Sequence, residues 1–245
     1  MTIEENSILT CARYAYRPNK LNYCGPDQNR ELFEYIKAGE DDGGLEENLQ
    51  KFETLFPYLK HIAYTNKKED IFDGKIVNAY WIGNNLLKNT GNARLYYYLT
   101  DNLELKKKLA RKEIENLSEK ILKGANAHHS FHVFNIWKRT GHIENPHTLY
   151  TMDECRIGWG KVKGIENEII NVLYRPLVFE NNKLKFGEIK SKKIFYELCD
   201  RKIKAGDWIS FHWSSFCDVL NEEDVAQLKY WTVLNLKLTN YYGKN

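Results

Sequence analysis

The stretch Gly206-Asp207-Trp208-Ile209-Ser210-Phe211-His212-Trp213 carries the clearest fold signal in the chain. Glycine and aspartate at its start favour a turn, and the aromatic and β-branched residues that follow favour a strand. A turn is also expected at Glu180-Asn181-Asn182. Further apolar runs typical of strands precede the stretch, at residues 169–178, 183–189 and 193–198. We therefore expect several short strands between Cys155 and Trp213.

A helix is expected directly after these strands. Asn221, with Asp224 three residues later, nearly matches a capping box, a motif that begins helices. Apolar side chains then recur at helical spacing on one face. They are Val225, Leu228, Trp231, Leu234 and Leu238. Several short strands followed by one packed helix are typical of a small OB-like β-barrel.

The part of the chain up to about residue 140 shows helical patterns instead. Apolar residues at helical spacing occur over 29–38, 45–56, 71–87 and 103–122, with a bend expected near Gly83. The segment 128–138 fits either a helix or a buried strand. We predict an α+β fold with two domains. They are a mainly helical N-terminal domain over residues 1–145 and a β-barrel with a C-terminal helix over residues 150–245.

Composition narrows the class of protein. The chain has 245 residues and a net charge of +3, which gives no support for nucleic-acid binding. Its N-terminus is acidic and lacks the apolar core of a signal peptide. No run approaches the roughly 20 apolar residues of a membrane helix. Five scattered cysteines do not suggest a disulfide framework. We expect a cytoplasmic protein that binds neither nucleic acid nor membrane.

The segment Tyr23-Cys24-Gly25-Pro26-Asp27 is expected to form a turn, because proline and glycine favour the required dihedral angles. A cysteine on such a turn is a candidate catalytic nucleophile if a cation lies near it, since only the thiolate is reactive. Arg13 and Arg17 are candidates for that cation. A structural turn with a half-buried cysteine explains the same pattern.

The segment His128-His129-Ser130-Phe131-His132 is the densest group of metal-capable side chains. On a helix, His128 and His132 are four residues apart and could chelate a divalent metal. We treat His132 as a candidate metal ligand. His128 and His129, together with Arg13, are candidate cofactor contacts. The alternative is that these imidazoles cap a helix start and form hydrogen bonds there.

Three matches in sequence order resemble the HypC/HupF-type chaperones of nickel-iron hydrogenase maturation. Cys155 is followed after four residues by Gly160-Lys161-Val162, as at the opening of those proteins. The strand Gly206 to His212 resembles their Gly-Asp-aromatic-aliphatic-x-aliphatic-His strand. Leu220-Asn221-Glu222-Glu223 resembles their entry into a C-terminal helix.

This resemblance implies a ligand and partners. The family's chaperones bind an iron-dicyanide-carbonyl fragment through the cysteine and the histidine that correspond to Cys155 and His212. It therefore implies iron as the cofactor, and a hydrogenase large subunit or other maturation proteins as partners. A thiolate and an imidazole also suit low-spin iron chemically. The residues alone leave open that Cys155 is an inert buried thiol and His212 a core histidine.

Nearly the whole chain also resembles an uncharacterised bacterial and archaeal family of unknown function. The resemblance rests on four segments: Ala12-Arg13-Tyr14-Ala15, residues 23–27, Ala79 to Asn84 and residues 128–132. It implies no activity.

The sequence therefore predicts an accessory factor in nickel-iron hydrogenase maturation that binds or delivers iron, or helps to make its ligands. One alternative is a cysteine- and histidine-dependent enzyme unrelated to hydrogenases. Another is a partner-binding protein with a metal-free barrel. Whether the protein is an enzyme stays open at this point.

Overall fold

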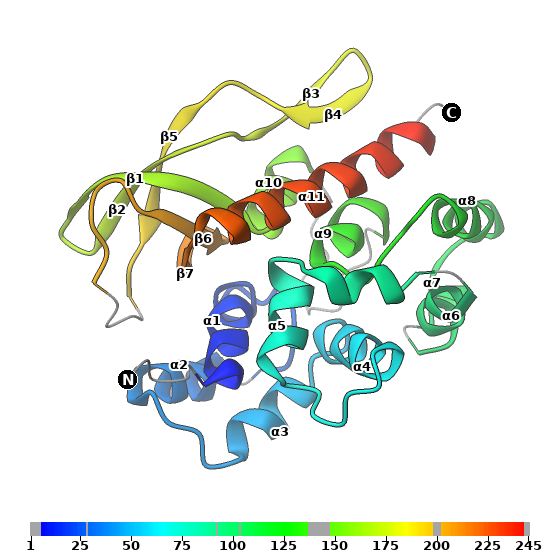
Figure 1. Ribbon diagram of the computed structural model, residues 1–245, viewed down its shortest axis with the longest axis horizontal. Coiled ribbons are helices and arrows are strands. Elements are labelled where there is room, and N and C mark those ends of the chain that lie inside the picture. The colour runs from blue at the N-terminus through cyan, green and yellow to red at the C-terminus, as the bar shows by residue number, and fades with distance from the viewer. Residues whose placement is uncertain are drawn as a thin grey trace.

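The computed structural model describes residues 6–27, 29–91, 93–102, 104–136, 148–197 and 202–242. Helices make up the N-terminal part, strands follow, and one long helix ends the chain (Figure 1). This order confirms the predicted α+β class, with its helical N-terminal part and C-terminal helix.

The helices before the sheet are short. The α-helices are α1 (Ser7–Lys20), α2 (Asn29–Ala38), α3 (Gly44–Gln50), α4 (Leu55–Thr65), α5 (Gly74–Trp81), α6 (Ala93–Tyr97), α7 (Leu105–Lys108), α8 (Arg111–Leu122), α9 (His129–Phe131) and α10 (Leu149–Cys155). A 3₁₀ helix, η1 (Asn85–Asn89), and two π-helical turns, η2 (Tyr98–Asn102) and η3 (His132–Ile136), lie between them.

Two of the helices expected from the sequence are each broken in two. The pattern over 45–56 divides between α3 and α4, and that over 103–122 divides between α7 and α8. The second break is stabilised locally, because the Ala110 N–H donates to a carboxylate oxygen of Glu113 at 2.7 Å and so begins α8. The expected helix over 29–38 and the bend near Gly83 are confirmed.

The segment over 128–138 is helical as far as the structure describes it. It forms α9 and continues as η3, and residues 137 and 138 lie outside the described residues. Of the helix and the strand that the sequence left open, the structure therefore shows the helix.

The main sheet has five strands, paired in the order β1-β2-β5-β7-β6, and β6 pairs again with β1. Each of the five strands therefore pairs with two neighbours, and the sheet forms a closed ring of strands. A separate hairpin, β3-β4, stands beside it. The strands are β1 (Gly158–Glu166), β2 (Ile169–Tyr174), β3 (Leu177–Glu180), β4 (Lys183–Phe186), β5 (Lys190–Phe195), β6 (Trp208–His212) and β7 (Ser215–Leu220). Neighbours are antiparallel except β5 and β7, which share one parallel bridge between Phe195 and Ser215.

The predicted strands are present, with different bounds. The run over 169–178 divides into β2 and β3 around Arg175-Pro176, because proline cannot donate to a strand ladder. The run over 193–198 begins three residues earlier, at Lys190, and its last residue lies outside the described residues.

Strand β7 has no counterpart among the strands expected from the sequence. Trp213 and Ser214 form the two-residue turn between β6 and β7, with left-handed φ angles of 50° and 56°. Such turns usually contain Asn-Gly or Asp-Gly, so the Trp-Ser pair gives no recognisable signal in the sequence.

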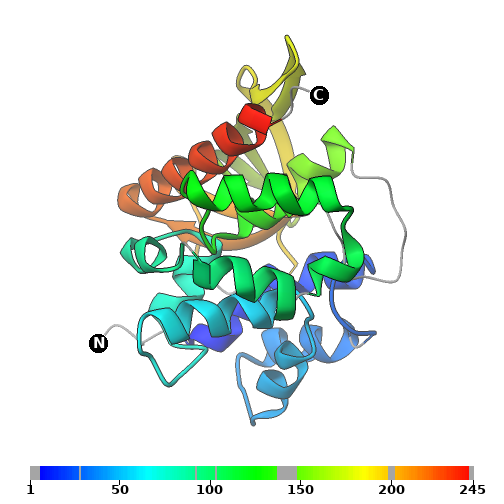
Figure 2. The same ribbon diagram turned by 90° about the vertical axis from the view of Figure 1, so that its right-hand side faces the viewer.

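The C-terminal helix α11 (Glu222–Tyr242) begins as predicted. The Asp224 N–H donates to the side-chain oxygen of Asn221 at 2.9 Å, and the Asn221 N–H donates to the Asp224 carboxylate at 3.2 Å. Helix α11 contacts β4 and β7 in the strand region and also α9 and η3 (Figures 1 and 2). It therefore joins the two parts of the fold.

One buried core extends from the helical part into the sheet. It contains Tyr14 of α1, Trp81 of α5, Cys217 of β7 and Trp231 of α11. The two predicted domains therefore share buried residues. Their boundary near residues 145–150 stays a prediction, and residues 137–147 lie outside the described residues.

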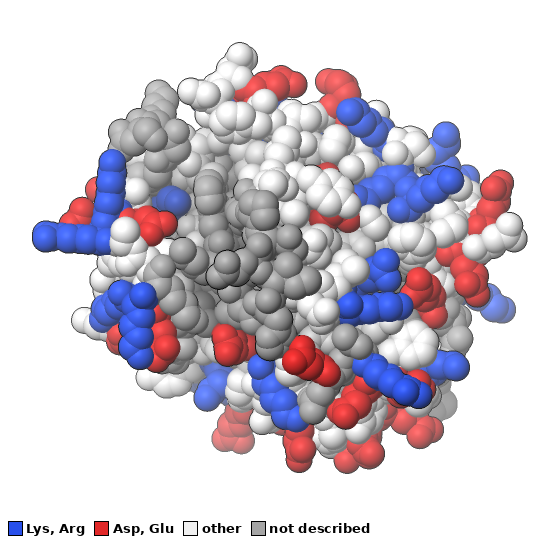
Figure 3. Space-filling view, turned by 180° about the vertical axis from the view of Figure 1, so that it is seen from behind, with Lys and Arg blue, Asp and Glu red and all other residues white. Residues whose placement is uncertain are grey.

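The surface carries both signs of charge. On the face drawn in Figure 3, basic and acidic side chains are interspersed. Within the described ranges, none of the helices combines the length and the apolar character that crossing a membrane requires.

Gly83 provides a test of how α5 and α11 pack together. Its φ is +102°, and a Cβ added there would overlap the ring of Trp231. We expect Gly83→Ala to lower the free energy of unfolding by about 2–4 kcal/mol, as the sum of backbone strain and overpacking. Gly124→Ala is the matched control, because Gly124 has φ +99° and an added Cβ would meet nothing within 4 Å. Urea unfolding measures both, and equal losses would contradict the proposed clash.

Candidate metal centre

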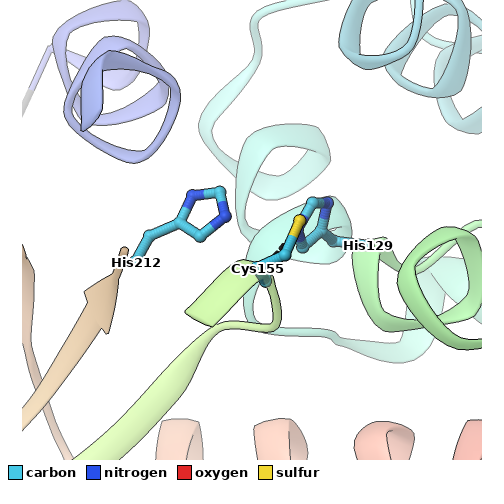
Figure 4. A group of neighbouring side chains, drawn as sticks. All are labelled: His129, Cys155 and His212. Carbon is cyan, nitrogen blue, oxygen red and sulfur yellow. Dashed lines mark hydrogen bonds between the residues drawn. The ribbon is translucent and has the colours of Figure 1, made fainter. Parts of the chain in front are cut away.

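His129, Cys155 and His212 each bring one potential ligand atom to within 4.8 Å of the other two. They come from α9, from the last residue of α10 and from the last residue of β6 (Figure 4). The group contains the pair Cys155 and His212 that the sequence put forward, and it adds His129.

The imidazole of His212 is held by one backbone group. Its Nδ1 lies 2.7 Å from the carbonyl oxygen of Tyr14, and a carbonyl only accepts, so Nδ1 carries the proton. Nε2 then has the free lone pair. That atom is buried and makes no hydrogen bond of normal geometry among the residues that the structure describes, although the backbone of Cys155 lies close to the ring. Metal-binding histidines commonly show this arrangement, with one nitrogen fixed by a carbonyl and the other left for the metal.

Both nitrogens of His129 are hydrogen-bonded. Nε2 lies 2.8 Å from the carbonyl oxygen of Cys155 and must donate to it, while Nδ1 lies 3.1 Å from the Tyr80 hydroxyl and accepts from it. A hydroxyl can also accept. The Tyr80 hydroxyl can therefore form a hydrogen bond with either tautomer of His129. If one of the two hydrogen bonds of His129 breaks, the released ring nitrogen becomes available to a metal.

Burial keeps these imidazoles neutral. Burial lowers the pKa of His212 from 6.5 to about 4 and that of His128 to about 3. It lowers the pKa of His129 well below its usual value, and the neighbouring His212 adds to that effect. The His129 and His212 rings therefore need to lose no proton before they bind a metal near neutral pH.

Aromatic rings surround the group. The Trp81 ring lies 4.7 Å from the ring of His129 and 5.7 Å from that of His212, centroid to centroid. Tyr14 stacks on Trp81 at 5.2 Å, and Tyr80 packs edge-on against His129 at 5.3 Å. Helix α5 therefore supplies much of the wall of the site.

Glu154 connects Cys155 to His212. Its backbone carbonyl accepts from the N–H of Trp213, the residue after His212, at 2.9 Å. Its buried carboxylate accepts from the Ser214 hydroxyl at 2.7 Å and forms an ion pair with Lys192 of β5. The end of α10 is thereby bound to the turn that ends β6.

Asp153 and Arg156 fix the other side of Cys155. They form a buried ion pair at 2.8 Å, and Asp153 also accepts from the N–H of Leu177 at 3.0 Å. Arg156 donates to the carbonyl of Arg175 at 2.7 Å. The two acidic residues that precede Cys155 in the chain are therefore each paired with a cation.

Helix α11 positions α9 through polar contacts. Asn235 of α11 donates to the Ser130 hydroxyl at 2.9 Å, and Asn126 accepts from the N–H of His128 at 3.1 Å. His128 itself caps α9, because its Nδ1 accepts from the Ser130 N–H at 3.2 Å. This is the capping role that the sequence left open for the histidine segment.

The other residues that the sequence put forward lie elsewhere among the described residues. Arg13 donates to the carbonyl of Cys217 at 3.0 Å. His132 packs edge-on against Tyr58, with ring centroids 5.7 Å apart. Cys24 is half-buried, and its carbonyl accepts from the Asn19 amide at 2.9 Å. The group of three contains none of them, nor His128. Their suggested catalytic, cofactor or metal roles stay predictions.

Tyr80, Trp81 and Glu154 are the neighbours of the site that sequence reasoning missed. Tyr80 and Trp81 belong to the segment Ala79 to Asn84, which the family resemblance had already marked without a role. Glu154 stands beside the candidate ligand Cys155, but its partners are on β5 and after β6. No local pattern shows such a contact.

A small cavity of about 230 Å³ lies on the side of Tyr14 and Trp81. Polar residues also line it, among them Asn78 and Asp218. The Trp81 ring therefore borders the cavity and also packs against His129 and His212.

Acid should destabilise the metal-free protein. The unfolded chain protonates its histidines near 6.5, whereas His212 and His128 in the folded chain do so only at about 4 and about 3. Below pH 6.5 the unfolded state therefore binds more protons, and each such histidine removes about 1.4 kcal/mol of stability per pH unit. Urea unfolding at several pH values measures the slope. His212→Gln should make it shallower, and an unchanged slope would show that His212 titrates normally.

The Asp153–Arg156 pair should be essential to the local fold. Arg156→Met leaves a buried carboxylate uncompensated, so we expect a loss of about 3–5 kcal/mol in the free energy of unfolding. Lys185→Met is the control, because the Lys185–Glu180 pair is about half exposed and should contribute less than about 1 kcal/mol. Chemical denaturation compares the two, and similar small losses would show that the buried pair contributes little.

Comparison with known proteins places the chain only at the level of the family. The model of a family of unknown function, DUF6390, matches residues 4–245. The comparisons with curated proteins and with solved structures found no match. The expectation of a family of unknown function that covers nearly the whole chain is confirmed. The resemblance to hydrogenase chaperones gains no support from these comparisons.

Proposed function

The chain belongs to the family of unknown function DUF6390, and we propose from its own geometry that it binds one transition-metal ion through His129, Cys155 and His212. In this role the protein is an accessory factor that holds a metal for another protein.

The observation that carries the proposal is the buried Nε2 of His212. A buried polar atom without a hydrogen bond costs free energy, about 1–3 kcal/mol. This one has no hydrogen-bond partner in the described part of the chain, and His212 belongs to the same group of potential ligands as Cys155 and His129. A bound metal would use its lone pair.

The proposed ligand set is chemically coherent. Thiolate sulfur and imidazole nitrogen together suit late first-row metals and not magnesium or calcium, which prefer oxygen. The two imidazoles are already neutral, so only the Cys155 thiol has to lose a proton. Metal binding should therefore release about one proton per ion.

The resemblance of the C-terminal part to hydrogenase chaperones supplies a candidate metal and recipient. We propose iron, alone or as the iron-cyanide-carbonyl fragment, and an acceptor among the nickel-iron hydrogenase maturation proteins. The support is that Cys155 and His212, the two positions carried over from that family, belong to one group of neighbouring ligand atoms.

The test is metal analysis of protein purified without oxygen, together with infrared spectroscopy. We expect about one metal per chain, lost in Cys155→Ala and His212→Gln, because each removes one ligand. Carbonyl and cyanide bands would identify the iron fragment.

Two buried side chains outside the group provide matched controls. Burial raises the pKa of the Cys11 thiol to about 12, so it stays protonated and Cys11→Ala should keep the metal. His61 forms its hydrogen bond with the carbonyl of Thr90, so His61→Gln should also keep it. Metal-free wild-type protein that takes up no added metal would refute the proposed function.

A further inference from the structure

We propose that this centre selects a soft monovalent cation, copper(I), over divalent ions. The inference rests on the proposed metal binding by His129, Cys155 and His212, and it names the class of ion from the charge and the surroundings of these residues. It is the alternative to iron for the same three ligands: the resemblance suggests iron, whereas the charge and the surroundings of these residues favour copper(I), and the experiment below decides between the two.

The ligand set is the first argument. Thiolate sulfur selects soft cations, and two imidazoles with one thiolate form the trigonal set of blue-copper sites, which favours copper but holds both of its oxidation states. The group of three contains no carboxylate among the described residues, although acidic side chains flank Cys155. Hard or larger divalent ions prefer such oxygen ligands.

The charge balance is the second argument. Cys155 would contribute one negative charge as a thiolate, and both imidazoles are neutral. The flanking acids do not add to this charge, because Glu154 pairs with Lys192 and Asp153 pairs with Arg156. A monovalent ion therefore leaves the centre neutral, whereas a divalent ion leaves one uncompensated positive charge.

The surroundings make that charge costly. The rings of Trp81 and Tyr80 lie against the imidazoles, and both rings are almost fully buried. An uncompensated charge in such surroundings is strongly disfavoured.

The number of ligands is the third argument. Three ligand atoms within 4.8 Å of one another can surround one ion in a trigonal arrangement. Zinc in a site with three protein ligands takes a fourth from water or substrate. Copper(I) is complete with three ligands and needs no fourth.

A comparison of two metal ions separates the effect of the ion's charge from the effect of its softness. Silver(I) and cadmium(II) are both soft, and they differ in charge. Reduced, metal-free protein is titrated with each ion without oxygen, and copper(I) and zinc(II) are titrated in competition with chelators. The reference is an unstructured peptide with one cysteine and two histidines, which has the ligands without the fold.

We expect the protein to prefer silver(I) over cadmium(II) at least about 100-fold more strongly than the peptide does, because burial penalises the extra charge. Copper(I) should bind one per chain, and X-ray absorption should show one sulfur and two nitrogens. Cys155→Ala and His212→Gln should each weaken copper(I) binding by at least about 100-fold, because losing a ligand costs more than losing a residue that only orients one. Cys11→Ala should not weaken it.

Equal preferences in protein and peptide would overturn this inference. So would divalent ions that bind as tightly as copper(I), or iron purified with its own anionic ligands. Each of those results would leave the proposed metal binding intact. Protein that binds none of the ions at this centre would instead refute the proposed function itself.

Discussion

The hydrogen bond from the Trp213 N–H to the carbonyl of Glu154 is the contact on which the candidate centre depends. It joins the residue after His212 to the residue before Cys155, two positions that are nearly sixty residues apart in the chain. The Glu154 carboxylate reinforces it by binding Lys192 and Ser214. Because α10 and the β6–β7 turn cannot separate without breaking these bonds, the thiol and the imidazole are held together before any ligand arrives.

The same arrangement has a cost in stability. Three imidazoles are buried in neutral form, and the Nε2 atoms of His128 and His212 have no hydrogen-bond partner in the described structure. Proteins tolerate such features at functional sites more often than elsewhere. The cost is offset by a core that extends through both parts of the fold, with Trp81 packed against the two imidazoles on one side and Tyr14 on the other. Stability and the proposed ligand set therefore depend on the same aromatic residues.

Much of the local structure could be predicted from the sequence, and the failures have physical reasons. Strand β6 and helix α11 follow from the turn at Gly206-Asp207 and from the box formed by Asn221 and Asp224, which are local signals. Strand β7 could not be predicted, because Trp213 and Ser214 at its turn adopt left-handed φ angles. Residues of these types rarely form such turns, so the sequence gives no turn signal there. The family resemblance marked Tyr80 and Trp81, but only their contacts with His129 show what they do.

The sequence by itself determined the α+β class, the position of the last helix, and Cys155 and His212 as residues to examine. These features depend on neighbours within a few residues or on short motifs. The tertiary structure alone brought His129 beside them, and it alone showed that His128 caps a helix. The reason is that α9, α10 and β6 meet only after the chain has folded, so that α11, the Glu154 contacts and the ring of Trp81 set which imidazole faces the thiol.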